Sequence, residues 1–166
     1  MEYLREARIR FREVQPMASW LQAMLIIAAV VMAAAIYPEM HDPKLVGPAK
    51  ALPLLGPALL VVCWLWLRQM EIALDDQNLS FGFGIFHPVV PIENIISCQP
   101  ENITMLRHGI GIHYARGVVC YNARLGPGVR IRVKGRKRDY VFSCNDAPRL
   151  ISLINEEISR RRPPSI

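Results

Sequence analysis

The sequence predicts a membrane α-helical hairpin followed by a mainly-β barrel or sandwich of about seven antiparallel strands with a C-terminal helix. Met17–Tyr37 and Ala51–Leu67 contain no charged side chain and are 21 and 17 residues long. A helix needs about 20 residues to cross about 30 Å of hydrocarbon. After Arg68 the pattern changes from long apolar runs to short alternating segments that end in turn residues. These observations divide the chain into a membrane part and a soluble domain over residues 68–162.

The two apolar runs are predicted to be helical, because a backbone in hydrocarbon must satisfy its own hydrogen bonds. Pro16 and Pro38 flank the first run and suit helix boundaries, since proline lacks an amide donor and restricts its neighbour. Pro53 and Pro57 lie near the start of the second run, where proline costs little. Residues 17–67 are therefore expected to form two transmembrane helices with a short outer loop.

A cleaved signal peptide is the main alternative for the first run, because Ala33-Ala34-Ala35 resembles a cleavage site. However, the preceding segment is long and mixed in charge, and the apolar core is longer than that of a signal peptide. The sequence therefore favours a retained span.

The charges beside the runs predict the orientation of the hairpin. Residues 1–16 hold four arginines, residues 38–50 hold two lysines, and the other 14 cations follow residue 67. Lys and Arg concentrate on the cytoplasmic side of membrane proteins. We therefore expect a multi-pass protein of the bacterial or archaeal inner membrane with both termini in the cytoplasm. Four cysteines without metal or redox spacing agree with a reducing compartment.

The segment before the first span, residues 1–16, is predicted to be a cytoplasmic amphipathic stretch. Apolar residues recur at helical spacing over Tyr3–Gln15, with arginines between them. Such a stretch lies in the membrane interface or packs against the soluble domain, and the sequence favours the interface.

The soluble domain contains seven segments with the alternation or turn boundaries of strands. They are Met70–Leu74, Leu79–Phe86, Ile92–Cys98, Ile110–Ala115, Val118–Ala123, Val129–Lys134 and Asp139–Cys144. The turn Asp75–Asn78 is a strong hairpin signal between the first two. Asp146–Arg162 then has the apolar stripe of an amphipathic helix, with Asp146 as N-cap. This helix is expected to cover an open end of the barrel.

Short motifs support a comparison with a known family. They are Arg12-Glu13-Val14-Gln15, Gly109-Ile110-Gly111-Ile112, Tyr121-Asn122-Ala123, Gly128-Val129-Arg130-Ile131 and Phe142-Ser143-Cys144. With them, residues 68–160 resemble bacterial pleckstrin-homology-like domains, and the whole chain resembles two-span membrane proteins that carry one. The resemblance implies an anchored interaction domain without an assigned reaction. It departs at the first hairpin loop, because Asp75 and Asp76 would repel the phosphorylated inositol that cationic loops of this family bind.

Cations gather on one predicted strand and the turn after it: Arg130, Arg132, Lys134, Arg136, Lys137 and Arg138. Alternation places the first three on one face, about 6.6 Å apart. We expect Arg130, Arg132, Lys134, Lys137 and Arg138 to contact anionic lipid headgroups or an acidic partner. A solvated face that keeps the sheet soluble is the competing interpretation. Nucleic-acid binding is disfavoured, because no aromatic residues alternate with these cations.

The sequence predicts no catalytic, metal or cofactor site. His108 and His113 are the candidate ligands or acid–base pair, with Cys120 or Cys144 nearby, but a spacing of five on a strand points the two rings to opposite faces. The glycines of Ser80–Gly84 precede no helix start and so do not form a nucleotide loop. The spans contain no Asp, Glu, Lys, Arg or His that would mark an ion path. An enzyme is therefore disfavoured.

We expect a non-catalytic scaffold or interaction protein that uses its cytoplasmic domain to contact protein partners or the anionic inner leaflet. The alternative is an accessory structural subunit of a larger energy-converting or transport complex. The small-residue face around Ala28 and Ala33 would favour close helix packing in either case. The expected partners are inner-membrane lipids and other membrane-protein subunits, without nucleic acid, small-molecule substrate or cofactor.

Overall fold

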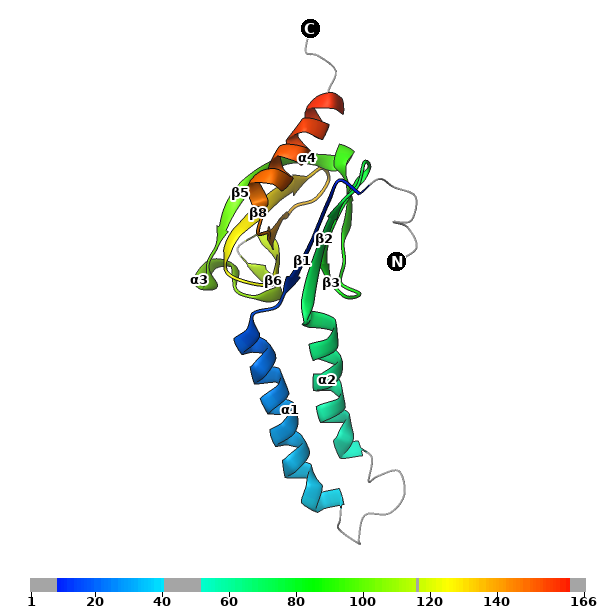
Figure 1. Cartoon of the computed structure of the whole chain (residues 1–166), viewed down its shortest axis with the longest axis vertical. Coiled ribbons are helices and arrows are strands. Elements are labelled where there is room, and N and C mark those ends of the chain that lie inside the picture. The colour runs from blue at the N-terminus through cyan, green and yellow to red at the C-terminus, as the bar shows by residue number, and fades with distance from the viewer. Residues whose placement is uncertain (1–8, 41–51, 116, 162–166) are drawn as a thin grey trace. The chain divides into compact units, whose positions relative to one another are not determined.

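The computed structural model describes residues 9–40, 52–115 and 117–161 and has a mixed α/β fold (Figure 1). It contains two N-terminal helices, sheets of four and five strands, and a C-terminal helix. The chain divides into a helical unit, residues 17–68, and a β unit made of residues 1–16 and 69–166. The β unit therefore takes residues from both sides of the helical unit.

The helical unit contains α1 (Ser19–Met40), the 3-10 turn η2 (Leu52–Leu54) and α2 (Leu55–Leu67). By length and composition, Ser19–Pro38 is able to cross a membrane, whereas α2 is shorter. Pro38 lies inside α1, so the prediction that it ends the helix is wrong. Near the C-terminal end of a helix, a proline removes only one of the last intrahelical bonds.

Close contacts hold the two helices of this unit together. The Met17 amide, just before α1, donates a hydrogen bond to the Arg68 carbonyl, just after α2, at 2.9 Å, and the Gln22 side chain of α1 donates to the same carbonyl at 3.5 Å. A Cβ atom at Gly56 would lie 2.6 Å from the Met32 sulfur. Glycine at this position therefore permits close approach of the helices.

The four-stranded sheet has the order β1 (Phe11–Pro16), β2 (Gln69–Leu74), β3 (Asn78–Phe83) and β4 (Val89–Pro91), with all neighbours antiparallel. The predicted hairpin turn is confirmed: Asp75 Oδ1 accepts the amides of Gln77 and Asn78 at 2.7 and 2.6 Å.

Strand β1 precedes the helical unit but pairs with β2, which follows it. The pairing extends from Phe11 opposite Leu74 to Pro16 opposite Gln69. The expectation of an interfacial helix is therefore wrong for Phe11–Pro16, which pack into the domain instead; residues 1–8 lie outside the described residues. Burial in this segment follows the alternation of a strand. Phe11 and Gln15 are buried, and their neighbours Arg12 and Val14 are exposed.

The five-stranded sheet has the order β5 (Ile95–Ile103), β8 (Gly126–Val133), β9 (Asp139–Ser143), β7 (Val118–Asn122) and β6 (Gly111–Ala115). Eight strands follow the helices in the described residues, where about seven were predicted. The all-antiparallel prediction is also wrong, because β7 and β9 pair in parallel. Two reversals through β8 separate them, so β9 returns beside β7 in the same direction.

The core joins the two sheets under the C-terminal helix. Phe81 of β3 stacks on Phe142 of β9 with ring centroids 4.4 Å apart. Helix α4 (Ala147–Arg161) buries Leu150 and Ile154, and Asp146 accepts the Arg149 amide, so the predicted helix and N-cap are confirmed. The predicted alternation on β8 is confirmed as well: its valines and Ile131 are buried, whereas Arg130 and Arg132 between them and Lys134 directly after the strand are at least partly exposed.

A polar network fixes β1 to the second sheet and to α4. The Gln15 side chain is fully buried, and its oxygen accepts a hydrogen bond from the Ser143 hydroxyl at 2.8 Å. Its nitrogen donates to Glu13 at 2.5 Å. The Glu13 carboxylate in turn accepts the Asn145 amide at 2.8 Å and the Asp146 amide at 3.3 Å. A carboxylate therefore caps the donors before α4, where the helix dipole favours negative charge.

We expect Gln15→Ala to lower the free energy of unfolding by about 1–3 kcal/mol, because it leaves a buried hydroxyl without its acceptor. Chemical denaturation of the full chain in detergent, followed by β-sheet circular dichroism, measures the change. The control is Arg12→Ala on the same strand. It removes an exposed ion pair with Glu71 and should cost at most about 1 kcal/mol. Equal effects of the two variants would contradict the role given to Gln15.

Candidate functional site

The predicted cationic residues lie on β8, on the turn after it and directly before β9. Arg132, Lys134, Lys137 and Arg138 are exposed, and Arg130 is half-buried. Arg130 and Arg132 share one face of the five-stranded sheet, as the alternation predicted, and the β8–β9 hairpin brings Lys134, Lys137 and Arg138 to the same end of these strands.

Two of these cations are neutralised by Asp139 at the start of β9. Its carboxylate lies 2.7 Å from the Arg130 guanidinium and 3.3 Å from that of Arg132. A second carboxylate, Glu101 of β5, lies 3.8 Å from Arg130. Burial raises the pKa of Asp139, but the hydrogen bonds and charges of the two arginines outweigh burial and lower it overall. Arg130 and Arg132 therefore stabilise the five-stranded sheet through these ion pairs.

The remaining cations lie on the segment Lys134–Arg138, which we call the cationic turn. Within the described part of the chain, its four cations form no ion pair. Arg136 lies over the ring of Tyr140 at 5.2 Å, and Arg138 lies over that of Tyr114 at 5.0 Å. Stacking on an aromatic face holds a guanidinium without neutralising its charge. The cationic turn is therefore the strongest candidate for contact with an anionic group.

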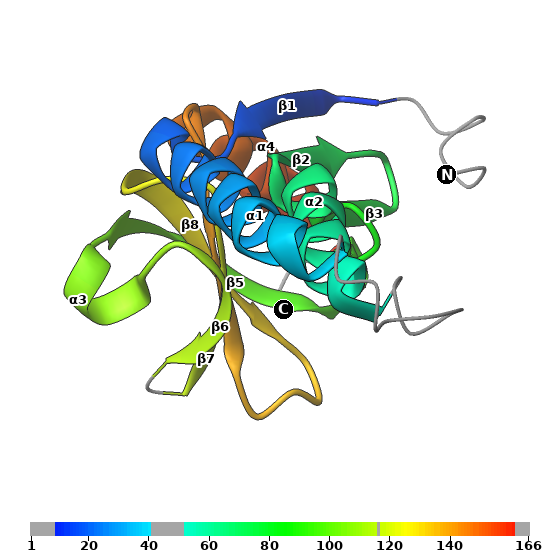
Figure 2. The same ribbon diagram turned by 90° about the horizontal axis from the view of Figure 1, so that it is seen from below.

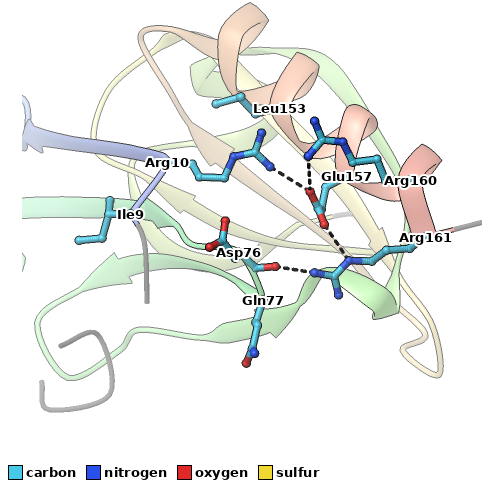
Figure 3. Close-up of a pocket in the computed structure, with 8 residues that line it drawn as sticks. All are labelled: Ile9, Arg10, Asp76, Gln77, Leu153, Glu157, Arg160 and Arg161. Carbon is cyan, nitrogen blue, oxygen red and sulfur yellow. Dashed lines mark hydrogen bonds and ion pairs between the residues drawn. The ribbon is translucent and has the colours of Figure 1, made fainter. Parts of the chain in front are cut away.

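A second polar feature is an open groove between α4, the start of β1 and the β2–β3 turn (Figure 3). Its volume is about 770 Å³, and it is lined by Ile9, Arg10, Asp76, Gln77, Leu153, Glu157, Arg160 and Arg161. Glu157 lies at the centre of its ion pairs, 2.9 Å from Arg10 and 3.0 Å from Arg161. Hydrogen bonding from Arg161 is the largest influence on the pKa of Glu157 and lowers it.

The ion pairs in this groove hold α4 to the elements beside it. Arg161 also donates to the Asp76 carbonyl, so α4 is fixed to the β2–β3 turn as well as to Arg10. Its arginines are largely committed to carboxylates, and it contains no nucleophile. This arrangement stabilises the β unit and offers little free charge to a ligand.

Within the described part of the chain, the histidines and cysteines do not come together as a reactive centre. His108 lies in α3 (Met105–His108), so the argument from strand spacing does not apply to it, while His113 lies on β6. Burial is the largest influence on the His108 pKa and lowers it, although Glu101 at 3.6 Å opposes this effect. Across the described ranges, no group of three His, Cys, Asp or Glu side chains could hold a metal ion.

The three thiols of the β unit are held in their protonated form. Burial raises the pKa of Cys98 to about 12 and that of Cys120 to about 11. Burial also raises the pKa of Cys144, and the nearby Glu13 carboxylate adds to the effect. The thiolate is the reactive species, so these buried cysteines are packing residues.

Comparisons with known proteins give no relative for this site. No family model, curated protein or solved structure matches the chain. The resemblance to pleckstrin-homology-like domains therefore stays a prediction based on its motifs.

Sequence reasoning found the cations but missed the groups that contact them. Ile131 pairs with Tyr140, so the next position outward brings Arg132 opposite Asp139. If a hairpin turn at Gly135 is assumed, the sequence alone places Asp139 opposite Arg132. Glu101 and Tyr114 come from other strands, and no local signal in the sequence connects them to the cations.

Asp139→Asn should lower the free energy of unfolding at neutral pH by about 1–3 kcal/mol, because it weakens charged hydrogen bonds. The lowered pKa means that this stabilisation is present above the unfolded value of 3.8 and is lost as the pH falls through the folded value. Wild type and variant should therefore converge in acid in a pH series of denaturation curves. Asp76→Asn is the control, since its exposed carboxylate has no partner among the described residues. A difference that persists in acid would contradict the assignment.

Proposed function

We propose that this chain is a non-catalytic, membrane-anchored interaction protein. In this proposal α1 and α2 form a two-crossing hairpin, and the β unit is a pleckstrin-homology-like domain in the cytoplasm. Its cationic turn contacts an acidic partner protein or the anionic inner leaflet. Lys134, Lys137 and Arg138 carry that contact, with Arg130 and Arg132 supporting the strand beneath it.

The exposure of α1 supports a transmembrane role. Its best window within Ser19–Pro38 has a mean hydropathy of 2.2, and none of it is buried. A core helix of a soluble protein would bury most of such a surface, since apolar patches this large are rarely left in water.

The single observation that carries the hairpin is the pairing of β1 with β2. Pro16 lies opposite Gln69, so the residues before α1 and after α2 must be on one side of any membrane. The chain between them therefore crosses an even number of times. If α1 crosses the membrane, η2 and α2 must form the second crossing. Their 16 residues span about 25 Å by ordinary helix rises. This length is close to the hydrocarbon thickness of about 30 Å.

The same pairing argues against a cleaved signal peptide. Cleavage after α1 would remove β1 from the edge of the four-stranded sheet. It would also remove the buried Phe11 and Gln15 and the Glu13 contacts before α4. A segment that is structurally part of the mature domain is poorly suited to removal.

Cysteine labelling of intact spheroplasts tests the hairpin. Lys44→Cys in the connecting segment should react with a membrane-impermeant maleimide from outside, whereas Lys137→Cys in the cationic turn should react only after permeabilisation. The unsubstituted chain supplies the background, because its three soluble thiols are buried. Labelling of both positions from the same side would contradict the two-crossing arrangement.

Charge removal tests the cationic turn. The triple variant Lys134→Gln, Lys137→Gln, Arg138→Gln should lose anionic lipid in native mass spectrometry if the leaflet is the partner. If the partner is an acidic protein, the variant should instead lose carbodiimide cross-links to it in membranes, with unchanged lipid content. Arg132→Gln is the matched control, because Asp139 already neutralises that charge. No change in either measurement would overturn this role for the turn.

A further inference from the structure

Five exposed apolar side chains lie on three turns of the β unit, and we call them the apolar rim. They are Ile85 (66% exposed), Phe86 (49%), Met105 (51%), Leu106 (99%) and Leu125 (41%). Leu106 in α3 is exposed almost as fully as in an extended chain. Scattered single apolar residues are normal on a surface, but a cluster from separate turns marks an interaction site.

Strand register brings these three turns to one end of the β unit. Phe83 pairs with Met70, so the turn after β3 lies beside the end of β1 and the start of β2. On the other sheet Ile103 pairs with Gly126, which places α3 beside Leu125.

The two sheets are aligned at this end by a hydrogen bond. Ser143 lies opposite Gly128 near the start of β8 and donates to Gln15 near the end of β1. Figure 1 shows α3 and the turn after β3 at the same end of the β unit as the end of β1, and Figure 2 shows this end face-on.

The chain enters and leaves the apolar helices from this same end. Only Met17 and Ala18 separate Pro16 from the start of α1, and only Arg68 separates α2 from Gln69. Fully extended, such linkers reach only about 10 Å. The attachments to α1 and α2 are therefore at the end of the β unit that carries the rim, and a bilayer crossed by these helices begins close to those attachments.

We propose that the apolar rim inserts into the interfacial layer of the bilayer that α1 and α2 cross, with lipid acyl chains around its side chains. This inference rests on the proposed hairpin. Interfacial segments bury apolar side chains about 5–10 Å into the headgroup boundary. Arg124 neighbours Leu125, is exposed and forms no ion pair among the described residues, so its guanidinium group suits anionic headgroups. Arg107 beside Leu106 is also exposed, although Glu101 lies 3.8 Å from it.

The rim and the cationic turn are separate sites. Gly126 begins β8 beside the rim, and Val133 ends it beside the cationic turn. The eight residues of the strand hold them about 25 Å apart. Insertion of the rim would fix the β unit on the membrane by a third attachment and would hold the cationic turn about 25 Å from that contact. Of the two contacts proposed for the cationic turn, rim insertion is therefore compatible with the acidic partner protein and not with the inner leaflet.

Depth-dependent quenching tests the inference on the full chain. Leu106→Cys, Ile85→Cys and the control Lys137→Cys are made in a Cys63→Ala background, labelled with an environment-sensitive fluorophore and reconstituted in phosphatidylcholine–phosphatidylglycerol vesicles. Labels at residues 85 and 106 should shift to the blue and be quenched by phosphatidylcholine with a doxyl group high on its acyl chain. The label at residue 137 should show neither effect. Leu106→Asp added to the Ile85→Cys variant should reduce quenching at residue 85, and because Leu106 is exposed, this substitution removes no core packing.

The outcomes separate the inference from the function on which it rests. Equal, unquenched signals at residues 85, 106 and 137 would overturn rim insertion. A blue shift at residue 106 that disappears on dilution of the protein in lipid would assign the rim to a second copy of the chain, which also overturns it. Failure of the maleimide labelling would overturn the hairpin itself. Correct labelling with an unquenched rim would overturn only the insertion.

Discussion

Six residue pairs between β1 and β2 determine how the rest of this chain is organised. They place strands from either side of the helical unit in one sheet, so that the two ends of that unit start from neighbouring positions. Side-chain contacts reinforce the pairing: Gln15 is bonded to Ser143, and Glu13 caps the donors before α4. The first and last elements of the β unit therefore stabilise each other, and β1 cannot leave without exposing buried polar groups.

Electrostatic pairing divides the positive charge of the chain into two classes. The formal net charge is +6, yet most arginines of the sheets and of α4 lie beside carboxylates. Such pairs fix α4 to β1 and β9 to β8. Among the described residues, four cations without an ion pair gather on the cationic turn, where Arg136 and Arg138 stack on tyrosine rings. The unpaired cations of the cationic turn are therefore better suited to bind an anionic partner than the ion-paired arginines around Glu157.

Local patterns predicted the elements whose stability is local. The Asp75–Asn78 turn, the alternation of β8 and the capped helix from Asp146 onward were all found from sequence, because each depends on neighbours along the chain. Strand β1 was missed, because its six residues also fit helical spacing and its partner lies more than 50 positions away. The parallel β7–β9 pair was missed for a similar reason, since register between distant strands has no local signal.

The sequence by itself determined the apolar character of α1, the surplus of cations after β8 and the absence of a readable catalytic motif, because these properties belong to composition and short spacing. Only the tertiary structure decided which cations stay free, since Asp139 and Glu101 reach the arginines from other strands. It also decided that Ile85, Leu106 and Leu125 share one end of the β unit. Long-range strand pairing sets these neighbours, and no single segment of the chain encodes it.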